Sequence, residues 1–197
     1  MTSLRFRTGG RGDAERVALL HADSWRRHYR GAYADSFLDG DIVTDRRAVW
    51  SARLAEPGGD SGPSGSGSGG SGNSRTIVAE DGIGLAGFVH VVFDHDDRWG
   101  SLVDNLHVSG GRRRTGIGTA LLTRAAGAVA EQAAEPSLYL WVLEQNSAAQ
   151  RFYEAVGGTC VEKAAVPPPG GVPGRLNGSP ARLRFVWPDA SRLGRAG

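Results

Sequence analysis

The run LYLWVL at positions 138–143 constrains the fold more than any other segment of this chain. A nearly continuous apolar run of this length is typical of a central strand that is buried on both of its faces. We therefore expect a sheet with this strand near its centre. The 197 residues, 40% of them hydrophobic, suffice for one globular domain with a real core.

Other strands and helices are predicted from hydrophobic periodicity. Alternation of apolar and polar residues, with flanking turn residues, predicts strands at 4–7, 76–80, 85–93, 101–108, 159–166 and 181–187. Apolar residues at helical spacing predict helices at 14–27, about 45–55, 115 to about 134 and 147–156. The sequence thus predicts a chain in which helices and strands are mixed.

Residues 57–74 differ in composition from the rest of the chain. They contain eight Gly and six Ser among eighteen residues, which cannot bury a core. We expect a flexible surface loop here rather than a linker between domains, because the first 56 residues are too few for a robust independent core. The sequence therefore predicts a single domain over residues 1–190, followed by a disordered tail at 191–197.

Charge and cysteine content argue against several classes of function. The chain has 23 basic and 21 acidic residues and a net charge of +2, which argues against nucleic acid as a partner. Cys160 is the only cysteine, so no intrachain disulfide or Cys-rich zinc site can form, and we expect no metal.

No stretch is apolar enough to span a membrane, and we expect a cytoplasmic monomer or homodimer without a membrane partner. Arg supplies every basic residue except Lys163, a bias that suggests a high-GC bacterial genome.

The segment SGGRRRTGIGT, residues 109–119, lies between a predicted strand and a predicted helix. Its glycines let backbone N–H groups approach a ligand closely, and the helix N-terminus and three consecutive arginines add positive charge, a combination that suits a pyrophosphate. Two common phosphate-binding motifs do not match. A Walker A loop needs Lys and then Ser or Thr where Ile117 and Gly118 stand, and the dinucleotide pattern G-x-G-x-x-G is absent. An ordinary Gly-rich turn with solvated arginines is the alternative.

Two sequence patterns resemble those of one family. The spacing Arg113-x-x-Gly116-x-Gly118 is similar to the Q/R-x-x-G-x-G/A signature of the GNAT N-acetyltransferase superfamily. Residues 146–158 follow N-x-x-A-x-x-F-Y-x-x-x-G-G, which resembles that family's N-x-x-A-x-x-[FL]-Y-x-x-x-G-[FG]. The resemblance implies an α/β (α+β) fold with a single mixed, mostly antiparallel central sheet of about six to seven strands. It also implies about four flanking helices and splayed central parallel strands.

The resemblance implies acetyl-coenzyme A as co-substrate. In the family, the pantetheine arm lies in the opening between the splayed strands and pairs with exposed backbone groups. The residues expected to contact the coenzyme are Leu106, His107, Val108, Arg113, Arg114, Thr115, Gly116, Ile117, Gly118, Thr119, Asn146 and Tyr153. Asn146 is also suited to capping a helix, and Ser147 with Gln150 matches a capping box.

Two residues are candidates for proton transfer. By the resemblance, the Tyr153 hydroxyl lies near the coenzyme sulfur, where a phenol can protonate the leaving thiolate; the alternative is an aromatic residue that packs beside Phe152. An amine with a pKa of about 10.4 is almost fully protonated at neutral pH and must lose a proton. Asp104 is the candidate base, with a purely hydrogen-bonding carboxylate as the alternative. For its neighbour His107, strand alternation favours packing on the opposite face.

The acceptor is predicted only as a class. The resemblance implies direct transfer to a primary amine of a small molecule or peptide, and Trp25, Tyr29, Tyr33 and Asp104 are the candidate acceptor-binding residues. The three aromatic residues suit a core equally well. The acidic turn DHDDRWG at 94–100 either gathers cationic acceptors or forms a solvated hairpin tip. A non-catalytic acyl-CoA-binding regulatory module on the same fold is the alternative function, and a nucleotide-phosphate binder is a weaker one.

Overall fold

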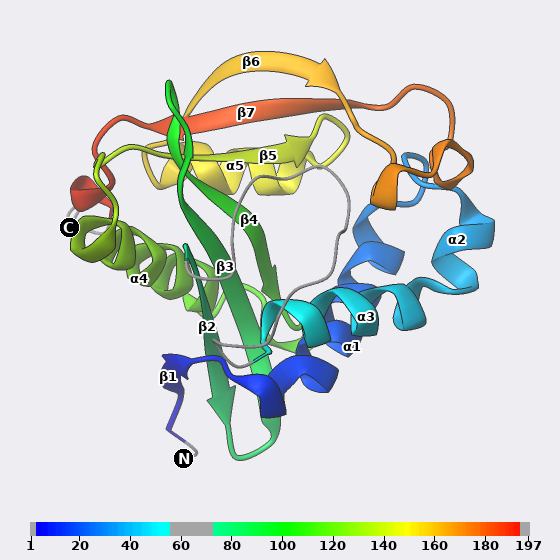
Figure 1. The fold of residues 1–197 in the computed structure, drawn as a ribbon, viewed down its shortest axis with the longest axis horizontal. Helices are drawn as coiled ribbons and strands as arrows, with labels where there is room; N and C mark the ends of the chain where they lie inside the picture. The colour runs from blue at the N-terminus through cyan, green and yellow to red at the C-terminus, as the bar shows by residue number, and fades with distance from the viewer. Residues whose placement is uncertain (1–2, 56–72, 194–197) are drawn as a thin grey trace.

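The computed structural model of the chain describes residues 3–55 and 73–193. Within these ranges one seven-stranded sheet has the order β1-β2-β3-β4-β5-β7-β6 (Figure 1). Its strands are β1 (Arg5–Thr8), β2 (Ser74–Asp81), β3 (Gly84–Asp96), β4 (Gly100–Val108), β5 (Leu138–Leu143), β6 (Thr159–Ala165) and β7 (Ala181–Trp187). Among these strands only β4 and β5 run parallel, and all other neighbours are antiparallel. The predicted mixed, mostly antiparallel sheet is confirmed.

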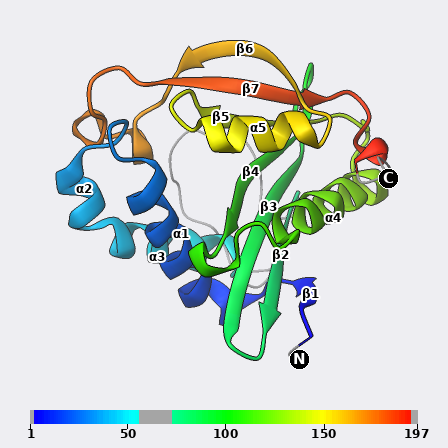
Figure 2. The ribbon, with the colours of Figure 1, turned by 180° about the vertical axis from the view of Figure 1, so that it is seen from behind.

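The described ranges contain five α-helices. They are α1 (Ala14–His28), α2 (Asp35–Asp39), α3 (Ile42–Arg53), α4 (Ile117–Gln132) and α5 (Ser147–Ala155). Side chains of α4 and α5 share a core with Ile77 and Val89 of the sheet, whereas α1 and α3 pack against Val78 and Phe88. Because successive residues of a strand point to opposite faces, the two groups of helices lie on opposite sides of the sheet (Figures 1 and 2).

β4 and β5 are paired only where both strands begin. Residues 101–103 lie beside residues 138–140, and the pairing of the two strands stops there. Beyond this point the strands diverge, with β5 continuing along β7 while β4 descends toward α1 (Figure 1). The divergence leaves one side of the C-terminal half of β4 without a neighbouring strand.

A β-bulge interrupts β4 just after its paired region. His90 of β3 pairs with Asn105 and Val91 pairs with Val103, so Asp104 is an extra residue without a partner on β3. An extra residue bends a strand and increases its twist. The bulge therefore separates the paired start of β4 from its divergent end.

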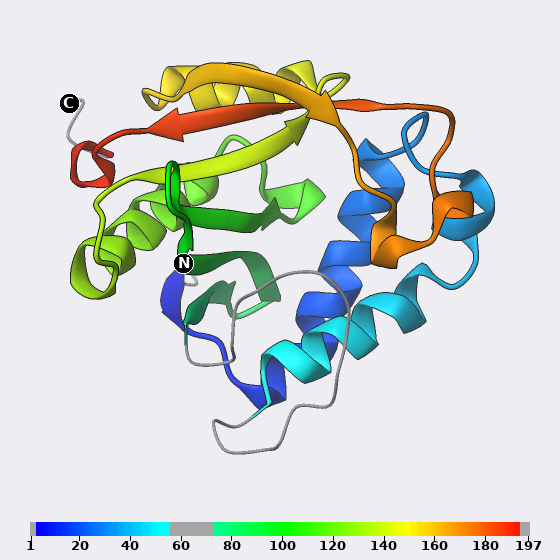
Figure 3. The same ribbon diagram turned by 45° about the horizontal axis from the view of Figure 1, so that its top comes forward.

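The connection between β6 and β7 packs against the chain that joins α1 to α2. The amide of Ala34 donates a 2.9 Å hydrogen bond to the carbonyl of Arg175, and Asn177 donates one of the same length to Ala32. Figure 3 shows this connection, in orange, beside α2. It links the outer strands of the sheet to the helices on the α1 side.

The predicted segments agree with the structure in part. β5 and β7 have the predicted bounds, and five of the six residues of β5 are buried. α2 was not predicted, and α3 begins at Ile42 rather than near residue 45. None of the helices in the described ranges is long and apolar enough to cross a membrane.

The predicted tail and loop have different outcomes. Ala190–Arg192 form a short 3-10 helix, and Leu193 is buried in the main core, so the tail predicted at 191–197 is wrong for its first three residues. The reason is that Leu193 packs with Ala190 against a core that is remote in sequence. Residues 194–197, and residues 57–72 of the predicted Gly/Ser loop, lie outside the described residues.

Candidate active site

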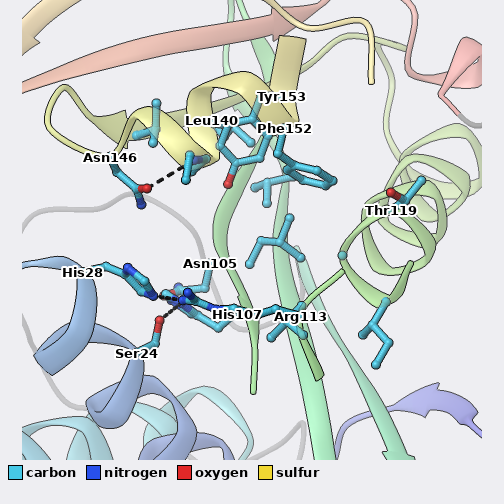
Figure 4. Close-up of a pocket in the computed structure, with 18 of the residues that line it drawn as sticks. Ser24, His28, Asn105, His107, Arg113, Thr119, Leu140, Asn146, Phe152 and Tyr153 are labelled. Atoms are coloured by element: carbon cyan, nitrogen blue, oxygen red, sulfur yellow. Dashed lines mark hydrogen bonds between the residues drawn. The ribbon is translucent and has the colours of Figure 1, made fainter. Parts of the chain in front are cut away.

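A cavity of about 740 Å³ lies where β4 and β5 diverge. The ends of these two strands, the turn at residues 109–116, the start of α4 and α5 border it, with Ser24 and His28 of α1 on the remaining side (Figure 4). Eleven of the twelve residues predicted to contact the coenzyme line this cavity. The exception is Thr115, whose hydroxyl donates a 2.6 Å hydrogen bond to the carbonyl of Arg112 within the turn.

The backbone of β4 offers groups to this cavity that no strand pairs with. The amide of Ser109 donates a 2.8 Å hydrogen bond to the carbonyl of Ala86, a residue of β3. Along a strand, successive residues direct their N–H and C=O groups to alternate sides. Leu106 and Val108 therefore direct theirs toward the space that β5 has left. Such groups favour an extended ligand that lies beside them like an added strand.

The first turn of α4 has no capping side chain among the described residues. Its N-cap residue is Gly116, which has a φ of +81°, a backbone conformation that glycine adopts without steric cost. Ile117, Gly118 and Thr119 open the helix and line the cavity. Their N–H groups have no partner within the helix, and the helix dipole adds positive potential there. This end of the cavity is suited to an anion such as a pyrophosphate.

The three arginines before α4 have different partners. Arg112 forms an ion pair with Asp81, and this contact lowers the pKa of Asp81 to about 2. Arg113 contacts the imidazole of His28. Arg114 lines the cavity, and it forms no ion pair with the described residues, unlike Arg112. Arg114 is therefore the arginine of this turn that remains available to an anionic ligand.

Tyr153 projects from α5 into the cavity (Figure 4). Its ring packs against Phe152, Phe185 and Trp187, with centroid separations of 5.3, 5.8 and 6.1 Å. Burial, with a smaller effect of Tyr29, raises the pKa of the Tyr153 hydroxyl above its usual 10. The phenol therefore keeps its proton at neutral pH, which is the protonation state that a proton donor needs. The packing and proton-donor interpretations are compatible, because the ring packs while the hydroxyl points into the cavity.

Asn146 caps α5 and also lines the cavity. Its Oδ1 accepts a 3.2 Å hydrogen bond from the amide of Ala149. The N-cap is therefore Asn146 and not Ser147, and Gln150 bonds two backbone carbonyls near the end of β5 instead of completing a capping box. The side-chain Nδ2 of Asn146 forms no hydrogen bond with the described residues, so it remains available to a ligand.

Asp104 lies where this cavity meets a second one. Its carboxylate, 32% exposed, forms a 2.7 Å ion pair with Arg53 of α3 and accepts a 2.6 Å hydrogen bond from Asn105. Burial raises the pKa of Asp104, but the charge of Arg53, aided by other nearby groups, lowers it by more, and the pKa lies below 3.8. The bulge falls on Asp104 itself, so strand parity cannot predict its direction.

His107 faces α1, on the side that alternation predicts. Its Nδ1 lies 2.8 Å from the hydroxyl of Ser24, and its ring contacts that of His21. Burial, with the nearby His28, lowers the pKa of His107 to about 3. The carbonyl of His107 faces β3, where a Cβ at Gly87 would lie only 2.9 Å from it. The side chain and the carbonyl of His107 are thus both engaged away from the gap beside β4.

The second cavity, of about 460 Å³, lies on the α1–α3 side of β5. All four candidate acceptor-binding residues line it: Trp25, Tyr29, Tyr33 and Asp104. The three aromatic rings contact one another, with centroid separations of 4.9 to 5.2 Å, and Trp25 and Tyr33 also belong to a buried core. Seven residues border both cavities: Tyr29, Val103, Asp104, Asn105, Trp141, Val142 and Leu143. The two cavities therefore adjoin beside Asp104.

Two aspartates of the acidic turn at residues 94–100 accept hydrogen bonds from backbone amides. The Asp94 carboxylate accepts 3.0 Å hydrogen bonds from the amide of Ala134, and Asp96 accepts bonds from the amides that follow it. Of this turn only His95 lines the second cavity. The geometry therefore favours the hairpin-tip interpretation over a role in gathering cations.

Sequence reasoning missed several residues that border the second cavity from distant elements. They include Arg46 and Arg53 of α3, His95, Tyr139, Trp141 and Arg182. Arg46 and Arg53 are separated by seven residues, which places them on one helix face and is a signal that the sequence contains. Nothing in the sequence alone places Arg182 in this cavity.

Comparison with known proteins agrees with this geometry. The family described as "Acetyltransferase (GNAT) family" matches residues 50–158, more than half of the chain. The chain therefore belongs to the GNAT acetyltransferase family. No curated protein gives a match to the sequence.

Solved structures with the same fold are distant in sequence. The PaiA N-acetyltransferase of Thermoplasma acidophilum, solved with coenzyme A, is 16% identical with a TM-score of 0.67, over 94% of this chain and 99% of that chain. YncA of Salmonella typhimurium, solved with acetyl-CoA, is 16% identical with a TM-score of 0.60, over 94% and 93%. A spermidine N-acetyltransferase SpeG mutant of Vibrio cholerae is 16% identical with a TM-score of 0.60, over 98% of both chains. These likenesses show the fold.

Proposed function

We propose that this chain transfers an acetyl group from acetyl-CoA to a primary amine by direct attack while both substrates are bound. The observation that supports this most is the cavity between β4 and β5. It combines the unpaired backbone of Leu106 and Val108, the uncapped start of α4 and the hydroxyl of Tyr153. These groups suit the pantetheine arm, the pyrophosphate and the leaving sulfur of one coenzyme.

The proposed reaction gives each group one role. The amine nitrogen attacks the thioester carbonyl, and the N–H of Val108 stabilises the oxyanion that forms. The C–S bond then breaks, and Tyr153 protonates the thiolate. The proton of the amine passes to Asp104, directly or through water, and Asp104 lies between the two cavities. Because Arg53 lowers the pKa of Asp104, this carboxylate is ionised at neutral pH.

The test is release of free thiol from acetyl-CoA across a panel of amines, with the N-acetylated product identified by mass spectrometry. We expect thiol release that depends on the amine and matches the product one to one. Calorimetry of acetyl-CoA binding is run beside it. Tight binding without turnover for any amine would favour the non-catalytic acyl-CoA-binding module, and absence of binding would overturn both functions.

A further inference from the structure

The second cavity contains more positive charge than the binding of an amine requires. Three guanidinium groups line it, those of Arg46, Arg53 and Arg182, against the single carboxylate of Asp104. Cations at short range repel an ammonium group. The positive charge is therefore better suited to another part of the acceptor.

Two of the three arginines already have carboxylate partners. Arg53 pairs with Asp104 at 2.7 Å. Arg46 pairs with Asp45 and also lies over the ring of Trp25, 4.3 Å from its centroid. These contacts hold both side chains in place without a ligand. Arg182 is the arginine of this cavity that has no such carboxylate partner among the described residues.

Arg182 of β7 has no ion pair or hydrogen bond with the described residues. Its Nε is buried without an acceptor, and its guanidinium lies over Trp141, 4.0 Å from the ring centroid. Burial and the neighbouring Arg184 lower the pKa of Arg182. Buried polar atoms in proteins normally have a hydrogen-bond partner.

Arg182 lies close to the junction of the two cavities. It pairs across the sheet with Leu143, which borders both of them, and neighbouring strands are about 4.8 Å apart. Trp25, Tyr33 and Trp141 provide aromatic walls around the same space. Such walls exclude water and strengthen an ion pair formed between them. Arg182 and Asp104 line the same cavity, so one small acceptor bound there can contact both.

We propose that the acceptor is a small zwitterion, an amine that also carries a carboxylate a few bonds away. The amino group lies beside Asp104, and the carboxylate binds the guanidinium of Arg182, whose planar fork matches a carboxylate in a bidentate geometry. The proposal rests on the proposed acetyltransferase function and specifies its substrate class. It also implies that polyamines are poor acceptors.

The first test uses the unmodified protein and matched acceptors. Each amino acid, for example leucine, is compared with its amide and with the amine that lacks the carboxyl group, and spermidine is included. We expect kcat/KM about 10- to 100-fold higher for the acid than for either analogue, the range that a charge-assisted hydrogen bond supplies. The amino group of the amide is less basic than that of the acid, so more of the amide is present as the reactive free amine. This difference favours the amide, and a preference for the acid would therefore be strong evidence for carboxylate binding.

The second test removes the guanidinium. Arg182→Gln should lower kcat/KM for the amino acid about 10- to 100-fold and leave the carboxyl-free amine and acetyl-CoA affinity nearly unchanged, while Arg182→Lys should restore part of the loss. Arg192→Gln is the matched control, because Arg192 is on the surface, 84% exposed, and pairs with Asp189. Quenching of tryptophan fluorescence by the N-acetyl amino acid, which should need Arg182, tests carboxylate binding without turnover.

The outcomes separate this inference from the proposed function. Turnover of amines with no preference for the carboxylate, or equal losses for acid and amine in Arg182→Gln, would overturn the zwitterion while leaving the acetyltransferase intact. If Arg182→Gln does not fold, the acceptor series and the fluorescence titration of the unmodified protein decide the question. Absence of turnover with every acceptor would overturn the acetyltransferase itself, and the inference with it.

Discussion

The two adjoining cavities are built from different kinds of parts. The cavity beside β4 and β5 comes mainly from two continuous stretches, residues 103–119 and 140–153, and offers backbone groups and a helix end. The cavity beside Asp104 takes side chains from α1, α3, β3, β4, β5, β7 and the chain after β6. A site made of backbone can be retained while side chains vary, whereas a site made of side chains can change its ligand by substitution. The first is therefore suited to an invariant coenzyme and the second to a specific acceptor.

The largest expected effect belongs to Tyr153, the proton donor of the proposed reaction in the cavity between β4 and β5. Tyr153→Phe should lower kcat by about 100-fold or more while coenzyme affinity changes little, because a general acid contributes on the order of 10²–10⁴. The ring contacts with Phe152 and Phe185 remain in this variant. The rate of thiol release measures kcat, and calorimetry measures coenzyme affinity. Full activity would reduce Tyr153 to a packing residue.

The helix end should be sensitive to charge and not to size. Gly118→Asp should weaken acetyl-CoA binding about 100-fold, because the carboxylate would oppose the pyrophosphate. Gly118→Ala is the matched control, since a Cβ there would meet its nearest atom, in Phe152, at an ordinary 3.4 Å. Because an aspartate in the first turn stabilises a helix, the melting temperature of Gly118→Asp should not fall. Equal affinity in the two variants would contradict the proposed pyrophosphate position.

In the second cavity, activity should depend on pH through the ionisation of Asp104. The Arg53 ion pair lowers the pKa of Asp104, so in the unmodified protein Asp104 keeps its charge down to low pH. Arg53→Gln removes the pair, burial then raises the pKa, and the acid limb of kcat/KM should move to higher pH. We expect the kcat/KM of Arg53→Gln to be about ten-fold below that of the unmodified protein at pH 5 and equal to it at pH 8.

Arg47→Gln provides the control for this pH profile. Arg47 lies on the same helix, is half exposed and pairs with Glu15 rather than with a residue of the cavity. Its substitution should leave the acid limb in place. A parallel shift in both variants would show that α3 affects the profile through its general charge and not through Asp104.

The smallest effect on catalysis is expected in the acidic turn. Joint replacement of Asp94, Asp96 and Asp97 by Asn should change the KM of any acceptor by less than about two-fold, because none of the three lines the second cavity. Loss of the Asp94 contacts to the chain after α4 should cost about 1 kcal/mol of unfolding free energy. Denaturant titration and acceptor kinetics measure both. A marked rise in KM for polyamines would restore a role in substrate capture.

Much of the fold followed from local sequence. β5 could be predicted because a run buried on both faces is apolar throughout. α4 and α5 could be predicted from their apolar spacing, and Gly157 and Gly158 end α5. The three-turn α3 was only partly predicted, since the bounds of its first turn depend on how Ile42 packs against α1 and α2. Leu193 was assigned to a tail because one apolar residue among polar ones has no periodicity.

The residues of the two cavities divide in the same way. Those of the coenzyme cavity lie at fixed spacings within one strand–turn–helix segment and one helix, and short-range spacing is what a sequence displays. Asp104 was found by position, but its bulge and its partner Arg53 depend on the register of β3 and on the docking of α3. Arg182 reaches the second cavity only because β7 lies beside β5, about forty residues earlier in the chain. Long-range register of this kind arises from packing of the whole sheet, and no local pattern encodes it.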